Sequence, residues 1–266
     1  LLNAHGIEVV QDLSQVGQGL QDHLTLTHYF AATAPTLNNR LGSIHGRLAA
    51  GLHYLLTRRG PLSVPVNQVG GFVRSDPSRP TPDVQVYCNP ASYTVPAKGP
   101  PQVDTDPGFL LCVQPCRPTS RGEIRIASSD PEEAPRIQPN SLATEEDRAQ
   151  AVRASMALRA LATTPTIARL MKAPKPPDII PMTEAEMLEN FRARAATNFH
   201  PTCTCRMGRD ETDSVLDARL RVHGIGGLRV VDASAFPNIT SGNTNAPTMM
   251  LAMRAAELIL EDAHQT

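Results

Sequence analysis

The sequence predicts an α+β fold in which an antiparallel β-sheet is flanked by helices. Three observations indicate this fold. Short segments of alternating apolar and polar residues are bounded by turn-forming residues, two longer segments show helical features, and proline-rich connectors join them. The chain has 266 residues, of which 41% are hydrophobic. This length allows one large domain or two ordinary ones, with a sizeable core.

The first residues are expected to continue a structure that begins further upstream. The segment "LLNAHGIEVVQDL" starts without a methionine. Residues 1–5 are typical of a helix end that stops at Gly6, and residues 7–10 are typical of a strand. We therefore expect an upstream part of the protein, which would also carry any targeting signal.

Strands are expected through the middle of the chain. In "GEIRIAS", Ile124 and Ile126 alternate with charged residues, which suits a strand with one buried face. The turn-rich segments around that strand favour antiparallel connections. The five predicted strands span residues 24–32, 70–74, 83–88, 109–114 and 123–127.

Two helices are predicted before the last quarter of the chain. Residues 144–163 begin with acidic residues, which suits a helix N-terminus, and end before Pro165. Residues 183–195 begin with Thr183 and Glu186 at the spacing of a capping box.

The last quarter of the chain is expected to form a strand, a polar loop and a helix. The apolar segment "GLRVVDASAFP" at 227–237 is interpreted as a strand that ends at Asp232. A carboxylate at such a position is typical of ligand contacts in α/β sheets. The helix is expected over 247–263, with Pro247 near its first turn.

Composition argues against several classes of protein. The net charge is −1 and the pI is about 6.8, so no basic field is available for nucleic acid. No apolar run approaches the ~20 residues of a transmembrane helix. Five sparse cysteines do not form a disulfide framework, which favours a reducing, cytoplasmic location. Cys112 and Cys116 are expected in the core.

The segment "NFHPTCTCRMG" at 198–208 raises three possibilities: a metal site, a redox pair or a catalytic base. The Cys-x-Cys spacing lacks the second ligand pair of a structural zinc site, and there is no Cys-x-x-Cys motif. We therefore expect Cys203 and Cys205 to pack and no metal to bind. His200 remains, either as an acid or base near neutral pH or as a packed structural residue.

The wider pattern resembles a known family. Together with the segment at 198–208, "VLDARLRVHGIGGLRVVDASAFPNITSGNTNAPTMMLAMRAAELIL" resembles the C-terminal signature of the glucose-methanol-choline (GMC) flavin oxidoreductases, nearest to the choline dehydrogenase-like branch. "HGIEVVQDLSQVGQGLQDHL", "GPLSVPVNQVGGFVRSD" and "RPTSRGEIRIASSDP" match further landmarks of the family in the same order.

The resemblance implies a division of the chain into three segments. Residues 1–24 would end the N-terminal segment of an FAD-binding domain, and residues 25–197 would form a substrate-binding domain with an antiparallel sheet. Residues 198–266 would carry the active site and contact FAD. They would supply the C-terminal strand and helix of an α/β domain whose dinucleotide-binding part lies upstream.

The resemblance also implies an activity: oxidation of a primary alcohol to an aldehyde by hydride transfer to FAD. His200 would be the catalytic base, and Asn245 would occupy the second active-site position. The electron acceptor would be a quinone, another carrier or oxygen. The residues expected to contact FAD are Asp232, Ala233, Asn245, Ala246, Pro247 and Thr248.

Some positions carry other interpretations. His23 is expected to be structural, and Asn243 is expected to shape its loop through left-handed geometry or a side-chain turn. Cys203 replaces a glycine that is usual in the family, and Gly19 stands where an asparagine is common. A truncated, non-catalytic remnant or binding module is the alternative function, and a GMC lyase is a more remote one.

Overall fold

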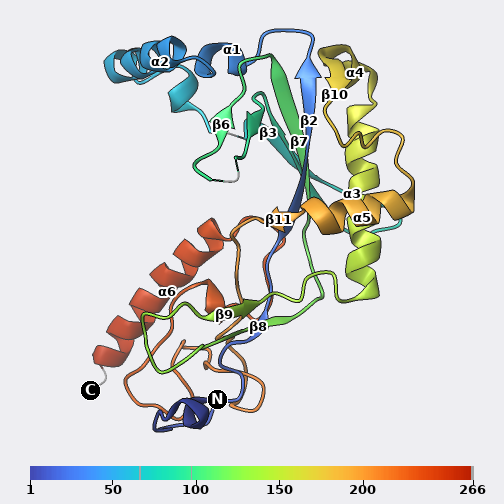
Figure 1. Ribbon diagram of the computed structural model, residues 1–266. Coiled ribbons are helices and arrows are strands. Elements are labelled where there is room, and N and C mark those ends of the chain that lie inside the picture. The colour runs from blue at the N-terminus through green and yellow to red at the C-terminus, as the bar shows by residue number, and fades with distance from the viewer. Residues whose placement is uncertain (66, 97, 265–266) are drawn as a thin grey trace. The chain divides into compact units, whose positions relative to one another are not determined.

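The computed structural model describes residues 1–65, 67–96 and 98–264 (Figure 1). Position 66, position 97 and the last two positions of the predicted 198–266 segment lie outside the described residues.

The chain forms two compact units, and each is built from separate stretches of sequence. Unit 1 comprises residues 1–23, 116–148 and 197–266, and unit 2 comprises residues 24–115 and 149–196. Residues 116–148 thus fold with the two ends of the chain. The roles that the family resemblance implies for the three segments stay predictions.

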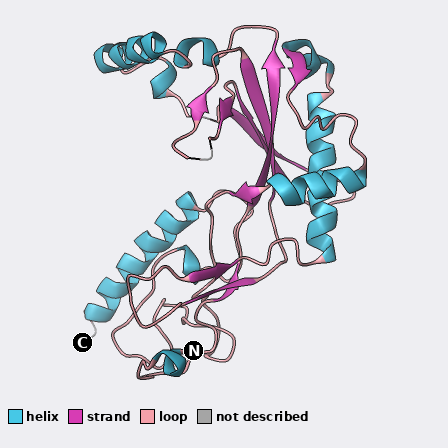
Figure 2. Ribbon diagram, in the orientation of Figure 1, coloured by secondary structure: helices cyan, strands magenta, loops and turns pink. Residues whose placement is uncertain are grey.

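Unit 2 is built on an antiparallel sheet with the strand order β10-β2-β7-β4-β3 (Figures 1 and 2). The expected strands 24–32, 70–74, 83–88 and 109–114 are confirmed, with ends that agree to within one residue. The strands are β2 (Leu24–Ala32), β3 (Val69–Val73), β4 (Val84–Asn89), β7 (Gly108–Pro115) and β10 (Met171–Pro174).

The centre of this sheet is β7, which pairs with β2 on one side and β4 on the other. All eight of its residues are buried, so it carries an apolar run rather than an alternating pattern. Phe109 lies opposite Phe30 of β2, and their rings stack with centroids 5.2 Å apart. Cys112 of β7 is buried as expected, and so is Cys116 of unit 1.

Helices complete unit 2. Both predicted helices are present, and the capping box of α5 is confirmed because Thr183 and Glu186 bond reciprocally. Small residues on one face of α3 let it pack closely. The helices are α1 (Asn38–Leu41), α2 (Ile44–Thr57), α3 (Glu145–Ala162), α4 (Pro165–Leu170) and α5 (Glu184–Arg194), with a 3₁₀ turn η2 (Pro61–Ser63). Two short strands, β5 (Tyr93–Thr94) and β6 (Gln102–Val103), pair with each other.

A buried histidine on β2 makes the stability of unit 2 depend on pH. His28 Nδ1 donates to the carbonyl of Pro177 at 3.2 Å, and Nε2 accepts from the amide of Asn190 at 3.1 Å. Burial, reinforced by the charge of Arg194, lowers the pKa of His28 from 6.5 to about 4. Below pH 6.5 the unfolded chain therefore binds a proton that the folded chain does not, and stability falls as the pH falls.

We expect this histidine to cost about 2 kcal/mol of unfolding free energy between pH 7 and pH 5. The measurement is urea unfolding at both pH values for the wild type and His28→Asn. The variant is less stable at pH 7, but its loss between the two pH values is smaller by that amount. Equal losses in the two proteins would show that His28 titrates normally in the folded state.

Unit 1 has less regular structure. Its sheet has the order β1-β8-β9, formed by β1 (Gln18–Leu20), β8 (Gly122–Arg125) and β9 (Arg136–Gln138). The predicted strand 123–127 is confirmed at its start and ends earlier. The remaining elements are the 3₁₀ turns η1 (Leu2–His5) and η3 (Ala233–Ala235) and the helix α6 (Asn245–Ala263). The short strand β11 (Ala196–Thr197) belongs to the larger sheet, where it pairs with β2.

Two predicted strands of unit 1 are wrong. Residues 7–10 form no strand, because the turn ended by Gly6 continues with a bond from the Ile7 N–H to the Leu2 carbonyl. Residues 227–237 form only an isolated bridge at Arg229 and then η3. There the carbonyls of residues 233–235 accept N–H groups from the 203–207 loop, so no continuous strand ladder forms.

The helix α6 is held in place by packing on the hydrophobic core of unit 1. Ala255 of α6 is buried against Ala235 of η3, together with residues from the 215–222 loop. The predicted helix 247–263 is confirmed, and it begins two residues earlier. In the described parts of the chain, no helix has both the length and the apolar character needed to cross a membrane.

Candidate active site

Two loops of unit 1 that are far apart in sequence lie side by side. Gln21 and Thr202 exchange backbone hydrogen bonds of 3.2 and 2.9 Å, and the N–H of Asn198 donates to the carbonyl of His23 at 2.9 Å. This short antiparallel contact places the "LQDH" segment next to the "NFHPTCTC" segment.

Asp22 fixes the backbone at the middle of this contact. One carboxylate oxygen accepts the N–H of His200 at 2.9 Å, and the other accepts the hydroxyl of Thr197. Hydrogen bonds to a charged acceptor are the stronger ones in proteins. Asp22 therefore holds the backbone of this loop at two points, Thr197 and His200, and so fixes the position of His200.

Two residues beside His200 have left-handed backbones. Phe199 has φ +58° and a largely exposed ring, while Cys203 has φ +76° and is buried. Such conformations cost of order 1–3 kcal/mol for non-glycine residues and tend to cluster at functional sites. A glycine would adopt the backbone conformation of Cys203 without this strain.

The surroundings of Cys203 and Cys205 favour the protonated thiol over the thiolate. Burial raises the pKa of the Cys203 thiol and of the Cys205 thiol. The Cys203 sulfur lies 3.1 Å from the hydroxyl of Thr202 and 3.4 Å from the amide oxygen of Gln21. The five cysteines, all among the described residues, form no disulfide, and the described residues contain no group arranged to hold a metal ion.

His200 contacts His23, the histidine that is expected from the sequence to be structural. The Nδ1 atoms of His23 and His200 are 3.0 Å apart, and the rings meet edge to face. The other nitrogen of His23 lies 3.0 Å from the carbonyl oxygen of Cys116. His23 is fully buried, and His200 is buried except for 8% of its surface.

These contacts determine which nitrogen of each ring carries the proton. The carbonyl of Cys116 can only accept, so His23 Nε2 must be protonated. The Nδ1 of a neutral His23 then carries a lone pair, and His200 Nδ1 must donate to it. The Nε2 of His200 is consequently unprotonated and available to accept a proton.

Burial keeps both rings neutral. Desolvation is the largest cause that lowers the pKa of His200 below 6.5, and the charge of Asp22 opposes it. Desolvation also lowers the pKa of His23, opposed mainly by the bond to Cys116. At neutral pH the pair therefore presents one unprotonated nitrogen, Nε2 of His200.

The residue that faces this nitrogen is Asn243. Its side-chain nitrogen lies 3.4 Å from His200 Nε2, an arrangement in which the amide donates and the imidazole accepts. Of the two roles expected for Asn243, the left-handed geometry is wrong, since Asn243 is not among the residues with positive φ, and the side-chain turn stays a prediction. The same loop places Asn245 two residues later, as the first residue of α6.

Asp232 and Ala233, which are also predicted site residues, belong to unit 1 as well. Asp232 caps η3, with its carboxylate accepting from the N–H of Ser234 at 2.7 Å, and it is exposed. Ala233 accepts the N–H of Cys203 through its carbonyl at 3.3 Å.

The N-terminus of α6 is open in the described structure. The N-cap is Thr244, with no side-chain cap bond, and Asn245 is the first residue of the helix. Asn245, Ala246 and Pro247 form the first turn, and Thr248 bonds back to the carbonyl of Thr244. The N–H groups of the first two residues have no partner within the helix and lie at the positive end of the helix dipole.

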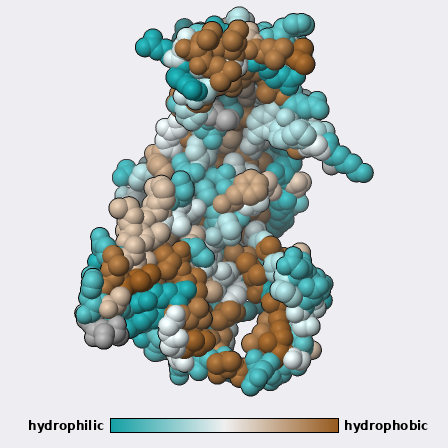
Figure 3. All heavy atoms as spheres, turned by 90° about the vertical axis from the view of Figure 1, so that its left-hand side faces the viewer, coloured by the Kyte–Doolittle hydropathy of each residue, from teal (hydrophilic) through white to brown (hydrophobic). Residues whose placement is uncertain are grey.

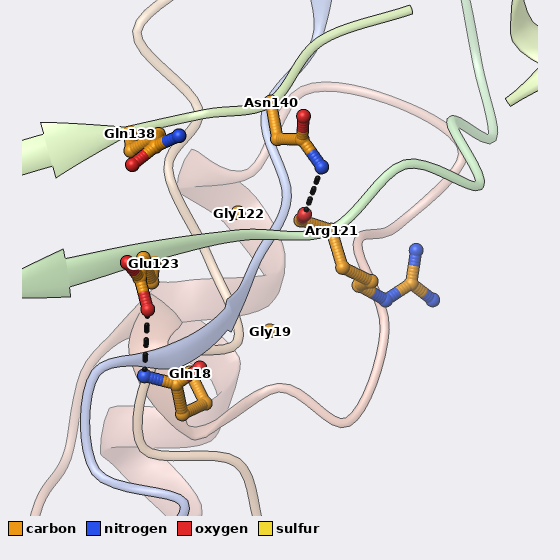
Figure 4. A pocket seen from close by; sticks show the side chains of 7 residues that line it. All are labelled: Gln18, Gly19, Arg121, Gly122, Glu123, Gln138 and Asn140. Carbon is orange, nitrogen blue, oxygen red and sulfur yellow. Dashed lines mark hydrogen bonds between the residues drawn. The ribbon is translucent and has the colours of Figure 1, made fainter. Parts of the chain in front are cut away.

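A separate pocket of about 320 Å³ lies beside the β1-β8-β9 sheet of the same unit (Figure 4). Its lining is polar, and several groups bond one another: Gln18 donates to Glu123 at 3.2 Å, and Asn140 donates to the carbonyl of Arg121 at 3.1 Å. His200 does not line it. The lining residues are Gln18, Gly19, Arg121, Gly122, Glu123, Gln138 and Asn140.

Gly19 in this lining has a structural reason to differ from the family's usual asparagine. Its φ is +78°, which asparagine also tolerates. A Cβ atom at Gly19 would lie 2.8 Å from the guanidinium of Arg206, however, so that arginine would have to move.

A comparison with protein-family models finds a match that covers about half of the chain. The family model described as GMC oxidoreductase matches residues 118–252. This range contains the 198–208 segment, η3 and the first turns of α6.

Two curated relatives match nearly the whole chain. The alcohol dehydrogenase [acceptor] of Pseudomonas putida is 38% identical over 260 residues, which cover 97% of this chain and 46% of that protein. The oxygen-dependent choline dehydrogenase of Vibrio vulnificus is 37% identical over 262 residues, covering 98% and 46%. The chain therefore spans less than half the length of these relatives.

A solved structure shows the same fold. The pyridoxine 4-oxidase from Mesorbium loti superposes with a TM-score of 0.78 at 28% identity, and the match covers 96% of this chain and 46% of that one. The predicted mixed fold, with an antiparallel sheet and helices, is therefore confirmed.

Proposed function

Because the chain belongs to the GMC oxidoreductase family, we propose that it carries the proton-accepting half of the active site of an FAD-dependent alcohol oxidoreductase. The reaction is oxidation of a primary alcohol to an aldehyde. The observation that supports this most directly is the unprotonated Nε2 of His200, held by His23 on one side and facing Asn243 on the other.

In this proposal His200 Nε2 takes the proton of the substrate hydroxyl. The O–H bond breaks, the proton forms a bond to Nε2, and the oxygen gains the electron pair. His200 then carries a positive charge and donates from both nitrogens, and its bond to His23 Nδ1 is kept throughout. FAD, when bound, supplies the acceptor for the hydride that leaves the alcohol carbon.

Asn243 is the group that we propose to stabilise the developing alkoxide. It is exposed, and its amide already points a donor at the position where the substrate oxygen must approach His200. A donor that is in place before the reaction costs little reorganisation. Asn245 was expected at this position, and we propose that it serves the cofactor instead.

The open start of α6 fits an anionic, hydrogen-bond-accepting edge of a flavin ring. The N–H groups of Asn245 and Ala246 are free of partners within the helix, and the helix dipole favours negative charge at this end. Thr248, Pro247, Asp232 and Ala233 are proposed to complete the FAD contacts.

The electron acceptor is proposed to be a quinone, another carrier or oxygen, and the alcohol to be a small molecule. The protein is proposed to act in the cytoplasm. The comparisons do not favour the non-catalytic alternative, since both curated relatives are named as dehydrogenases.

The test is spectroscopic. The protein is produced from its complete reading frame, its visible spectrum is recorded, and choline or simple primary alcohols are added without oxygen. Flavin absorbance that bleaches on addition of one alcohol is the expected result and identifies the substrate. A protein without flavin absorbance, or with absorbance that no alcohol bleaches, would contradict the proposed reaction.

A further inference from the structure

The helix α2 of unit 2 turns its most apolar side toward solvent. An ordinary amphipathic helix packs its apolar stripe on the core. In α2, five aliphatic side chains fall within an arc of roughly 120° at 3.6 residues per turn, and each is 59–76% exposed. These residues, called the leucine face below, are Ile44, Leu48, Leu52, Leu55 and Leu56.

The space-filling view shows the result. Hydrophobic surface gathers at the top of the view, over α2 and the residues next to it (Figure 3). Leu62 and Val64, at and just after η2, are also about half exposed and extend the apolar surface beyond the end of the helix.

A different side of α2 holds it in place. Gly46 lies so close to the preceding loop that a Cβ atom there would be 1.9 Å from the carbonyl oxygen of Arg40. Ala50, one turn later, is the buried residue of the helix. Both lie on the side opposite the leucine face, so the leucines are not needed to anchor α2.

The stretch of sequence that contains α2 carries arginines but no acidic residue. Residues 24–75 contain five arginines and no aspartate or glutamate. Arg47, Arg58 and Arg59 are exposed near the two ends of α2, and the guanidinium of Arg58 lies 5.5 Å from the ring centre of Tyr54. The carboxylate of Asp104, on a neighbouring loop, is paired with Lys175 at 2.7 Å.

We propose that α2 docks on an anionic lipid surface, lying in the plane of the membrane. The leucine face would enter the boundary between headgroups and acyl chains, and the arginines at the helix ends would contact phosphates. Arginine suits this position because its stem is apolar and its charged end can reach the headgroups.

The composition of the face favours lipid over a protein partner. The fully buried centres of protein interfaces are enriched in aromatic residues and methionine, whereas this face is purely aliphatic. Its arginine rim with no acid between residues 24 and 75 matches a negatively charged surface. This proposal is independent of the proposed alcohol oxidation.

Vesicle sedimentation tests the proposal. The protein from its complete reading frame is mixed with phosphatidylcholine vesicles that contain or lack phosphatidylglycerol. We expect binding to the anionic vesicles that weakens with salt. The double variant Leu52→Gln/Leu56→Gln should bind more than tenfold less tightly, and Arg58→Gln/Arg59→Gln roughly twentyfold less, since each arginine contributes about fivefold.

Matched controls separate docking from general loss of structure. Met156→Gln/Leu170→Gln changes two exposed apolar residues of unit 2 outside α2 and should bind like the wild type. Far-UV circular dichroism should be the same for all variants.

Three outcomes would overturn the proposal. The wild type fails to bind anionic vesicles, the Leu52→Gln/Leu56→Gln variant binds as tightly as the wild type, or light scattering shows that this variant converts a dimer to a monomer while neither protein binds vesicles. The last outcome would assign the face to a second copy of the chain.

Discussion

Replacing His200 by glutamine is expected to slow flavin reduction by about 10²- to 10⁴-fold, the usual contribution of a general base. Glutamine keeps a polar side chain of similar size, but it cannot accept the hydroxyl proton at neutral pH. The affinity for the alcohol should change little, because the lost interaction develops in the transition state. Anaerobic stopped-flow bleaching of the flavin at several alcohol concentrations separates the two quantities.

The pH dependence gives a second, independent sign of the same role. The pKa of His200 is lowered by burial, so the base is already neutral at pH 7. The wild-type rate should be level around neutral pH and fall tenfold per unit below the pKa. His200→Gln should lose this acidic limb.

The exposed residue His264 provides the control. His264→Gln should reduce the flavin like the wild type. A His200→Gln variant with an unchanged reduction rate would remove His200 from the mechanism.

Local patterns in the sequence predicted four strands of the unit 2 sheet, but not β10, which lies in a segment interpreted as a proline-rich connector. Alternation or an apolar run, bounded by turns, locates β2, β3, β4 and β7 to within one residue. The strand signal failed in unit 1 for 227–237, because the bonding partners of that segment come from a loop that carries no strand pattern of its own. An apolar segment alone does not reveal whether a ladder can form.

The helix α2 went unpredicted for a related reason. Its apolar residues have helical spacing, and Ser43 accepts from the N–H of Gly46 as an N-cap. Two internal glycines, Gly46 and Gly51, weaken the helix signal. Only the structure shows that Gly46 permits a close backbone approach and that the leucines face outward.

The candidate site was predicted in part. His200 was singled out from its own segment, with support from the resemblance. The resemblance placed the second active-site position on Asn245, whereas the contact of Asn243 with His200 Nε2 is seen only in the structure. The partnership of His23 with His200 joins residues 177 positions apart, and no local pattern predicts such a contact.

His23 therefore has a testable role as a positioning residue. His23→Leu removes the only described acceptor for the Nδ1 proton of His200, so the ring is free to carry its proton on Nε2 or to rotate. We expect flavin reduction to slow by about a hundredfold, the cost of misplacing a catalytic group by roughly 1 Å. The buried carbonyl of Cys116 also loses its partner, which should lower the unfolding free energy by about 1–3 kcal/mol.

The conservative variant His23→Gln distinguishes positioning from stability. A glutamine amide can accept from His200 Nδ1 through its oxygen and donate to Cys116 through its nitrogen, so most of the rate should return. Nitrogen-15 NMR of the imidazoles provides the readout that stability alone cannot change. In the wild type and His23→Gln, His200 should show an unprotonated Nε2, and in His23→Leu this signal should shift toward the protonated form.

A purely structural His23 predicts a different pattern. Both variants would then slow the reaction only in proportion to the folded protein that they lose, and the nitrogen signals of His200 would be the same in all three proteins. The tautomer of His200 thus decides the matter, because a base that holds its proton on Nε2 has no lone pair to offer the alcohol. If His23 sets that tautomer, the active site depends on a residue that never touches the substrate.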